Sequence, residues 1–523
     1  MRGSASIILI FLYYFSTLAV LGSKYRKNVL FIVVDDLRPA LGCFNDSDAV
    51  TPNLDSLARV STIFTRSYSQ QALCAPSRNS FLTSRRPDSL YLYDTHSYWR
   101  VTAGNYTTIP QHLKNHGYTT ASFGKIFHPG IASNYNDDSP WSWSEPPFHP
   151  STLKYKNAKV CLDDSGALGK NLVCPVDPAL QPEGTLPDLQ TTEAASKYLN
   201  TYNNSSPFFV AVGYHKPHIP LKFPREFLKY HNLDKISQPY PKLWPQKVSF
   251  VSWNPWTDLR ERDDVEKLNL TFPFQPIPEN FAQVVRQHYF AAVTYIDRQI
   301  GELIQTLKSL RLMEDTIILV VGDHGWSLGE HSEWAKYSNF EKSVRVPLII
   351  YDPDLSQTVR ADNRENAGSF VRDDLVELVD IFPTLNDLVA LPKMPACKKV
   401  DFSPLCTEGR SLAPLLYSQE RVEHWRTAAF SQYPRPNDFP QTNSDQPRLR
   451  DVKFMGYSAR TDKLRLTWWV RFQDLTPNWN TTEGEELYDH TIDPAEEFNL
   501  AYRPEFKNVK DSLKDLIKWQ FSR

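Results

Sequence analysis

A cysteine placed directly before Pro-Ser-Arg is the first residue of this chain that could do chemistry. Cys74 opens the segment Cys-Ala-Pro-Ser-Arg, which ends at Arg78 and stands where a helix is expected to begin. An arbitrary cysteine is most often a small buried residue without a chemical role. Whether Cys74 has such a role depends on the side chains that the fold brings next to it.

Adjacent carboxylates offer a second kind of chemistry, the binding of a cation. Asp35 and Asp36 directly follow the apolar run 28–34. Two neighbouring negative charges repel each other unless a cation neutralises them, and oxygen ligands of this kind suit Ca²⁺ or Mg²⁺. A turn or a helix cap is the alternative role for such a pair.

Four segments with the pattern of buried strands are each followed at once by polar side chains. These segments are 28–34, 118–123, 207–213 and 316–321. In open α/β sheets, ligands bind in the crevice beyond the carboxyl ends of the strands. The sequence therefore predicts that Cys74 shares one site with the residues after these segments, namely Asp35, Asp36, Lys125, His128, His215, Asp323 and His324.

Two other patterns near the predicted site carry weaker signals. His215 and His218 form an H-x-x-H pair, but Pro217 prevents the helix that would put both imidazoles on one face, so zinc is not expected. The aromatic residues between 141 and 149 could stack on sugar rings, or they could pack beneath a long loop.

These side chains need a large α/β framework to position them. Residues 346–351 have the pattern of a further strand, and 280–310 have that of a long amphipathic helix. A helix is expected to start at Thr51-Pro52, and residues up to Phe64 keep near-helical spacing. The proline-rich stretch 221–278 is expected to form long loops. We predict a large mixed, mostly parallel sheet flanked by helices.

The composition changes around residues 408–426, and the chain then takes on an antiparallel character. Residues 455–460 and 464–472 are predicted as paired strands, and 506–521 as a terminal helix. This pattern favours a smaller C-terminal α+β subdomain built on an antiparallel sheet. We therefore expect a signal peptide at 1–23, a catalytic domain at 24–417 and a C-terminal subdomain at 418–523.

Length and composition are those of a large globular protein. The chain has 523 residues, of which 41% are hydrophobic, and can bury a large core. Its 58 Lys and Arg residues nearly balance its 60 Asp and Glu residues. Bulk charge therefore does not indicate a nucleic-acid partner, and an anionic ligand must be held by a local cluster of cations.

The N-terminus has the features of a secretory signal peptide. Arg2 precedes an apolar core at 7–21, and Gly22-Ser23 offer a cleavage point. A membrane anchor is the alternative, although this core is short for a full span. No later segment has 18 uncharged apolar residues, so we expect no membrane span in the mature chain.

Cysteine spacing and glycosylation sequons fit the same secretory route. Two short-loop disulfides, Cys161–Cys174 and Cys397–Cys406, are the economical pairing. Cys43 and Cys74 then remain, and a bridge between them would remove Cys74 from chemistry. Acceptor patterns for N-glycosylation occur at Asn45, Asn105, Asn203, Asn204, Asn269 and Asn480.

The segment around Cys74 resembles the Cys-x-Pro-Ser-Arg signature of the type I sulfatases, a family within the alkaline-phosphatase superfamily. The resemblance extends over nearly the whole mature chain, and its further blocks are Val34–Pro39, Gly124–Gly130, Gly213–Pro220, Asp323–Trp326, Glu333–Phe340 and Ser431–Pro436. One position departs from the family pattern. The signature usually continues Leu-Thr-Gly-Arg, and this chain has Ser84 in place of the glycine.

The resemblance implies a modified nucleophile and a bound cation. Cys74 is expected to be oxidised to formylglycine by the formylglycine-generating enzyme, and the hydrate of that group provides the nucleophilic oxygen. Ca²⁺ is the implied cofactor, and Mg²⁺ is not excluded by these donors. The implied ligands are Asp35, Asp36, Cys74, Asp323 and His324.

The same resemblance implies roles for the cationic and imidazole side chains. Arg78 anchors the hydrate, and His128 acts as a base when sulfate is released. Lys125, His215 and Lys336 hold the sulfate and ease the departure of the sugar oxygen. His215 and Lys336 are also expected near the carboxylate of a uronate substrate.

The longer blocks favour an exo-acting sulfatase that removes the 2-O-sulfate of L-iduronate 2-sulfate at the non-reducing ends of heparan sulfate and dermatan sulfate. The partners implied are therefore sulfated glycosaminoglycan oligosaccharides. Three alternatives stay open: a sulfatase for another sulfate ester, a phosphatase or phosphodiesterase on the same scaffold, and a glycan-binding relative without catalysis. The resemblance adds the lysosome as the destination, with secretion as the alternative.

Overall fold

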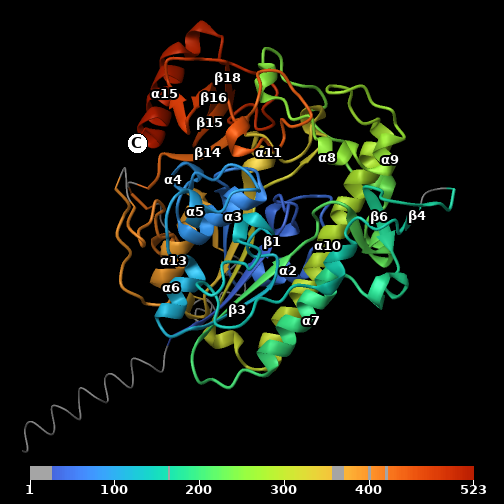
Figure 1. The fold of residues 1–523 in the computed structure, drawn as a ribbon, viewed down its shortest axis with the longest axis vertical. Coiled ribbons are helices and arrows are strands. Elements are labelled where there is room, and N and C mark those ends of the chain that lie inside the picture. The colour runs from blue at the N-terminus through green and yellow to red at the C-terminus, as the bar shows by residue number, and fades with distance from the viewer. Residues whose placement is uncertain are drawn as a thin grey trace, which may run out of the picture.

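A computed structural model describes residues 26–162, 165–355, 370–398, 402–418, 422–423 and 425–522. The expected signal peptide at 1–23 lies outside these residues. A seven-stranded sheet with helices on both faces forms the larger part, and a second, antiparallel sheet carries α15 (Lys507–Phe521) (Figure 1). None of the described helices is long and apolar enough to cross a membrane.

The large sheet is mixed and mostly parallel, as the sequence predicts. Four neighbouring strands are parallel, in the spatial order β9 (Thr316–Gly322), β1 (Asn28–Val34), β7 (Phe208–Tyr214) and β3 (Thr119–Gly124). Beyond β9 the order continues with β12 (Arg345–Tyr351), β2 (Thr62–Tyr68) and β13 (Phe370–Glu377). β12 runs antiparallel to both of its neighbours.

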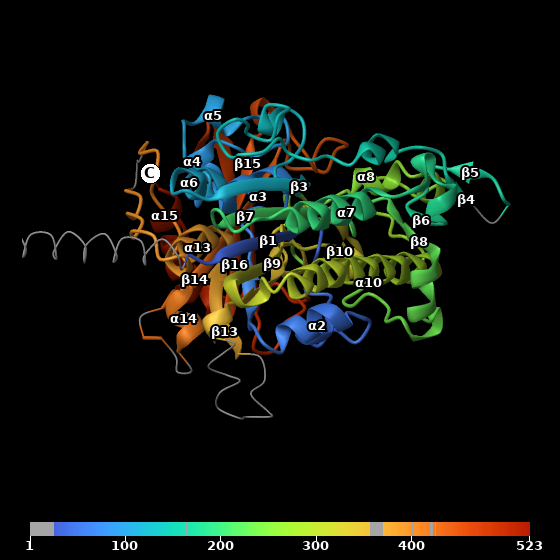
Figure 2. The ribbon, with the colours of Figure 1, turned by 90° about the horizontal axis from the view of Figure 1, so that it is seen from below.

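Alternate residues of β1 enter two different cores, because successive side chains of a strand point to opposite faces. Leu30 and Ile32 share a core with α2 (Pro52–Ala58), α7 (Pro187–Asn200) and α10 (Glu279–Ser309). Phe31 and Val33 share the other core with α3 (Cys74–Thr83), α6 (Ile109–Asn115) and α13 (Ile381–Leu388). Figure 2 shows α2 and α10 on one side of the sheet and α3 and α6 on the other. Burial on both faces explains why β1 is an uninterrupted apolar run.

In the large sheet, the structure departs from the sequence interpretation at two strands. β2 and β13 were not predicted, and Phe64 lies in β2 and not on the preceding helix, because that helix ends at Ala58. β2 lacks the apolar pattern of a buried strand because it contains polar residues, although the side chains of Thr62 and Ser67 are buried.

The stretch 221–278 is more ordered than the loops expected for it. It contains β8 (Leu221–Pro224), which pairs in parallel with β6 (Val173–Val176). It also contains the short helices α8 (Thr257–Arg260) and α9 (Asp263–Glu266). The stretch therefore contains a strand and short helices between its loops.

The expected antiparallel sheet is present in the C-terminal part of the chain. Its strands are β14 (Ala428–Arg435), β15 (Phe454–Thr461), β16 (Leu464–Gln473), β17 (Thr476–Asn478) and β18 (Gly484–Asp489). α15 packs against it around a separate core. The Gln432 N–H donates to the Gln70 carbonyl oxygen at 2.8 Å, and the Ser431 hydroxyl donates to the Ser69 carbonyl oxygen at 2.6 Å. These bonds fasten β14 to the segment after β2.

The described cysteines include both disulfides that the spacing favours. Cys161 is bonded to Cys174, and Cys397 is bonded to Cys406. Cys43 and Cys74 are free thiols in the described chain, so the bridge that the sequence left open is not formed. Cys74 is therefore available for chemistry.

Candidate active site

The polar residues that follow the four parallel strands meet at one place. β9, β1, β7 and β3 are neighbours and run in the same direction, so their carboxyl ends lie along one edge of the sheet. Cys74 reaches this edge as the first residue of α3, and Lys336 reaches it directly after the short strand β11 (Trp334–Ala335). The fold thus brings together the residues that the sequence assigned to one site.

Cys74 lies at the centre of this cluster. Its sulfur is 3.3 Å from Asp35 Oδ1, 3.3 Å from His324 Nε2 and 3.1 Å from Lys336 Nζ. Burial and the neighbouring Asp35 raise the pKa of the thiol to about 12, so the sulfur stays protonated at neutral pH and is a poor nucleophile. The side chain is therefore inert as a cysteine, although its surroundings are those of a reactive centre.

The acidic residues around Cys74 fit a divalent cation. Asp35, Asp36, Cys74 and His324 offer ligand atoms that all lie within 4.8 Å of one another. Asp36 Oδ2 is buried and has no hydrogen-bond partner among the described residues. Burial, together with the charges of Asp35 and Asp323, raises the pKa of Asp36 to about 7. A cation would compensate this concentration of carboxylates and satisfy the unpartnered oxygen.

His324 is prepared to act as a ligand. Its Nδ1 bonds to the Gly325 carbonyl oxygen at 3.0 Å, which places the proton on Nδ1 and leaves the lone pair on Nε2. Burial lowers the pKa of the imidazole to about 4, so the ring is neutral. Nε2 lies 3.5 Å from Asp36 Oδ1 and 3.5 Å from Asp323 Oδ2. A neutral ring aimed at carboxylates is the arrangement that a metal-binding histidine requires.

Arg78 orients the carboxylates from one helical turn after Cys74. Its guanidinium is fully buried and donates from Nε to Asp323 Oδ2 at 2.8 Å and from an Nη atom to Asp35 Oδ1 at 3.3 Å. Asp323 Oδ1 also accepts from the backbone N–H groups of Asp36 and His324, both at 3.0 Å. Asp323 is therefore fixed from several directions.

Two lysines add positive charge on either side of Cys74. Lys125 Nζ lies 2.5 Å from Asp35 Oδ2, and Lys336 Nζ lies 2.7 Å from Asp36 Oδ1. Burial alone would lower the pKa of both ammonium groups, but the neighbouring carboxylates outweigh burial and raise it. Both side chains therefore remain cations and can attract an anion.

Two histidines near Cys74 both have lowered pKa values, but their neighbours differ. His128 Nδ1 is buried without a partner among the described residues, and burial and the charge of Lys125 hold the pKa of this ring well below its usual value. His215 Nδ1 lies 3.5 Å from Asp188 Oδ1. Burial lowers the pKa of His215, and Asp188 partly offsets that effect. Asp188, at the start of α7, was not predicted as part of the site.

A cavity of about 330 Å³ opens beside Asp35. The predicted residues Lys125, His128 and His215 line it, and so does His218, which the sequence considered only as a zinc ligand. The position of His218 shortly after β7, on the same strand end as His215, was a signal that could have placed it in the site. The cavity is of the size found for small-molecule sites.

Ser84, the departure from the family signature, lies at the far end of α3 from Cys74. Its backbone has a φ of 54°, in the left-handed region where glycine is favoured at a helix end. The Ser84 hydroxyl donates to the Val379 carbonyl oxygen at 2.5 Å and lies 2.7 Å from Thr407 Oγ1. The serine therefore alters a helix end and not the surroundings of Cys74.

Comparison with known proteins agrees with this geometry. The family model described as Sulfatase matches residues 27–391. The chain is 49% identical over 514 residues to the iduronate 2-sulfatase of Mus musculus, with 93% of both chains covered, and 48% identical over 499 residues to that of Homo sapiens, with 90% of both covered. The crystal structure of the phosphonate monoester hydrolase of Agrobacterium radiobacter shares the fold, with a TM-score of 0.69, 18% identity and 95% of both chains covered. The chain belongs to the sulfatase family.

Proposed function

We propose that this protein is an exo-acting sulfatase that hydrolyses the 2-O-sulfate of L-iduronate 2-sulfate at the non-reducing ends of heparan sulfate and dermatan sulfate. The observation that carries the hydrolase activity is the position of Cys74 within a formylglycine motif, with its sulfur within 3.3 Å of Asp35, His324 and Lys336. The choice of sugar rests on the similarity to two iduronate 2-sulfatases over at least 90% of the chain.

Two groups complete the site. Formylglycine formed from Cys74 supplies the nucleophilic oxygen, which a thiol with a raised pKa cannot replace. A divalent cation supplies positive charge for the sulfate oxygens, and the residues that would hold it are Asp35, Asp36, Asp323, His324 and the modified Cys74. We propose Ca²⁺, because carboxylate oxygens dominate this donor set, with Mg²⁺ as the other hard cation that it suits.

The cationic side chains hold the sulfate in place. Lys125 and Lys336 keep their charges in spite of burial, so they can neutralise the negative oxygens of the ester without rearrangement. Arg78 lies one helical turn after Cys74 and is held by Asp323, which positions its guanidinium to anchor the reacting residue. Preorganised charges of this kind stabilise an anionic transition state.

The two histidines move protons. His128 is a neutral ring at the cavity wall, so it can act as the base that takes a proton when sulfate is released. His215 lines the same cavity, and Asp188 beside it partly offsets the lowering of the His215 pKa by burial. We assign His215 to the departing sugar oxygen, which needs a proton or a positive charge as its bond to sulfur breaks.

The site, and not the fold, argues against two alternatives, a phosphatase or phosphodiesterase and a glycan-binding relative without catalysis. The likeness to a phosphonate monoester hydrolase illustrates that the scaffold alone does not select the ester. The cysteine motif favours a sulfatase over a phosphatase or phosphodiesterase. A glycan-binding relative without catalysis would not need the buried contacts of Arg78, Lys125 and Lys336 with three carboxylates.

We propose a secretory route with the lysosome as destination, and secretion as the other outcome. All six asparagines of the sequons are exposed, so a modifying enzyme can reach them. The two disulfides fit an oxidising compartment. The formylglycine-generating enzyme is the proposed maturation partner and acts on Cys74.

The deciding experiment measures sulfate release by the full-length protein, purified from a host that makes formylglycine. Three disaccharides are compared that carry one sulfate each, on iduronate O2, on glucosamine O6 or on glucosamine nitrogen. We expect release from the first alone, and a Cys74 peptide with the mass of formylglycine. Converted protein that leaves the first disaccharide intact would overturn the proposed substrate, and an unmodified thiol throughout would overturn the proposed mechanism.

A further inference from the structure

The cavity contains three lysines that the sequence did not single out, Lys156, Lys216 and Lys222. The ammonium groups of Lys216 and Lys222 each donate to two backbone carbonyl oxygens. The ammonium group of Lys156 has no hydrogen-bond or ion-pair partner within the described part of the chain. Lys156 is therefore a cavity cation whose charge is available to a ligand.

The segment that carries Lys156 is held in place on its N-terminal side and by the side chain of Lys222. The 3₁₀ helix η3 (Ser151–Tyr155) precedes it, and the N–H and hydroxyl of Thr152 both donate to Gln190 Oε1 of α7, at 3.1 and 2.7 Å. Lys222 Nζ donates to the carbonyl oxygens of Tyr155 and Lys156, at 3.0 and 3.5 Å. The backbone at Lys156 is thus positioned and not left to a free loop.

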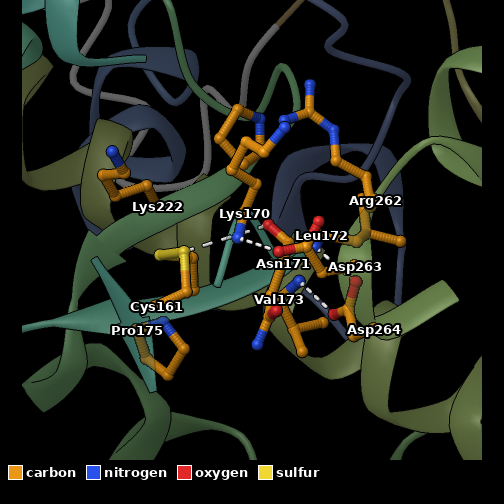
Figure 3. Close-up of a disulfide and its surroundings, with 12 residues drawn as sticks. Cys161, Lys170, Asn171, Leu172, Val173, Pro175, Lys222, Arg262, Asp263 and Asp264 are labelled. Atoms are coloured by element: carbon orange, nitrogen blue, oxygen red, sulfur yellow. Dashed lines mark hydrogen bonds between the residues drawn. A yellow bond between two sulfur atoms is a disulfide. The ribbon is translucent and has the colours of Figure 1, made fainter. Parts of the chain in front are cut away.

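The C-terminal side of the same segment is held by a disulfide. The chain passes into the Cys161–Cys174 bond, which ties it to β6 (Figure 3). Asp264 accepts from the N–H groups of Leu172 and Val173 just before Cys174, at 2.6 and 3.0 Å. β6 pairs with β8, the strand that carries Lys222. The segment that carries Lys156 is therefore fixed on both its N-terminal and its C-terminal side.

The charge of Lys156 acts on the catalytic end of the cavity. Burial lowers the pKa of Lys156 to about 8, and the charge of Lys125 adds to that effect. His218 lines the same cavity as Lys156, and its Nε2 lies 3.9 Å from Asp36 Oδ2. Protein surrounds Lys156, yet its side chain is open to water within the cavity. An anion bound at Lys156 would relieve the repulsion between Lys156 and Lys125.

We propose that Lys156 binds a second anionic group of the substrate, a carboxylate or a sulfate, while the reacting sulfate lies beside Lys125. This inference rests on the proposed function and adds a specificity-determining residue to it. The group has two possible sources, the carboxylate of the reacting uronate and a sulfate on the neighbouring sugar. Both present negative oxygens to which an ammonium group can donate.

The test measures binding to the Cys74→Ala protein by calorimetry, because binding needs no turnover. The probes are the methyl glycoside of iduronate 2-sulfate, which has a carboxylate but no second sulfate, and a disaccharide of iduronate 2-sulfate with N-sulfated glucosamine. We expect Lys156→Gln to raise Kd about 10-fold for a probe with the recognised group. Lys156→Arg should preserve the affinity. The matched control is Lys159→Gln, an exposed lysine on the same loop outside the cavity lining, which should leave Kd unchanged.

The outcomes distinguish the uronate carboxylate from the neighbouring sulfate as the group bound by Lys156. They also distinguish failure of the Lys156 contact from failure of the proposed function. A rise in Kd for both probes assigns the contact to the carboxylate, and a rise for the disaccharide alone assigns it to the neighbouring sulfate. The inference is overturned if Lys156→Gln stays within about twofold of its parent for both probes, or if the parent binds neither probe. Binding that depends on Lys156, without sulfate release by the converted wild-type protein, would defeat the proposed function and leave this inference standing.

Discussion

Asp36 shows, at the scale of single residues, how much charge the site concentrates in a buried place. Its backbone has a φ of 60°, which is unfavourable for a residue other than glycine. Lys336 Nζ bonds to Oδ1 at 2.7 Å, while Oδ2 has no hydrogen-bond partner among the described residues. Strained backbone and an unsatisfied buried oxygen cluster at functional sites. A cation held by Asp36 would satisfy the unpartnered oxygen.

Removal of the cation should therefore lower the stability of the protein. We predict that adding Ca²⁺ to chelator-treated protein raises Tm, because a ligand at a hundredfold excess over Kd stabilises the folded state by about 2.7 kcal/mol. Asp36→Asn should lose most of this rise, and Asp511→Asn, at an exposed carboxylate, should keep it. Thermal scans with and without the ion measure the effect. An undiminished rise in Asp36→Asn would contradict the assignment of Asp36 as a ligand.

Cys74→Ser should keep the fold and lose turnover. Serine matches cysteine in size, but it has no aldehyde form and cannot release the sulfate in the way that formylglycine does. We expect kcat to fall by at least about 10⁴-fold with Tm nearly unchanged. Cys43→Ser is the matched control, because Cys43 is the other free thiol. Neither Cys43 nor Asp55, which accepts from the Cys43 N–H, is part of the cavity lining. Full turnover by Cys74→Ser would refute the mechanism.

At the scale of elements, Glu330 joins three segments that carry or support the site. Its carboxylate lies 2.8 Å from an Nη atom of Arg38, just after β1, and 3.4 Å from an Nη atom of Arg286 on α10. It also accepts from the Leu328 N–H at 2.6 Å, in the segment that leads to Lys336. Burial alone would raise the pKa of Glu330, but the two arginines hold it well below its ordinary value of 4.5.

Glu330→Gln should cost about 3 kcal/mol of unfolding free energy, because it leaves the buried Arg38 without its carboxylate and takes from Arg286 one of its two, the other being Asp48. A lowered folded-state pKa stabilises the fold fully above pH 4.5 and loses that effect as pH falls towards the folded-state value. The difference between variant and parent should therefore shrink as the pH falls below 4.5. Urea titrations at several pH values measure it. Glu279→Gln, at an exposed ion pair with Lys242, is the control and should change little. A difference independent of pH would rule out this account.

At the scale of the whole molecule, a buried ion-pair network joins the two sheets. Arg465 on β16 lies 2.7 Å from Glu496 Oε1 and also pairs with Glu341 of α11 (Glu341–Val344), next to β12 of the large sheet. A second junction pairs Glu377 of β13 with Arg86 at 2.7 Å and with Arg426 at 2.8 Å. Such junctions fix how the smaller sheet sits on the larger one.

Arg465→Met should destabilise the junction without touching the site. The substitution leaves the buried carboxylates of Glu341 and Glu496 with weaker compensation, so we expect a loss of about 3 kcal/mol. Specific activity of the folded protein should be retained, because Arg465 does not line the cavity. The control is Arg471→Met on the same strand, whose ion pair with Glu483 is exposed. Equal stability of the two variants would show that the junction contributes little.

Local sequence determined the elements whose pattern is complete within a few residues. β1 is apolar throughout because it is buried on both faces, and Asp35 follows it directly, so both strand and candidate ligand were predictable. β2 was not predictable, because its polar residues are buried only through pairing with β12 and β13, more than 200 residues away in the chain. A strand of that kind has no local signature.

The same division holds for the site. The sequence by itself determined the spacing of Cys74 and Arg78 on one helix face and the polar residues at the strand ends, because helix period and strand direction are local properties. Only the tertiary structure decided that His218 and Lys156 line the same cavity. These residues belong to loops far apart in sequence, which meet because Lys222 and the Cys161–Cys174 bond hold them together. Packing between distant segments, which no local pattern encodes, sets the shape of the cavity.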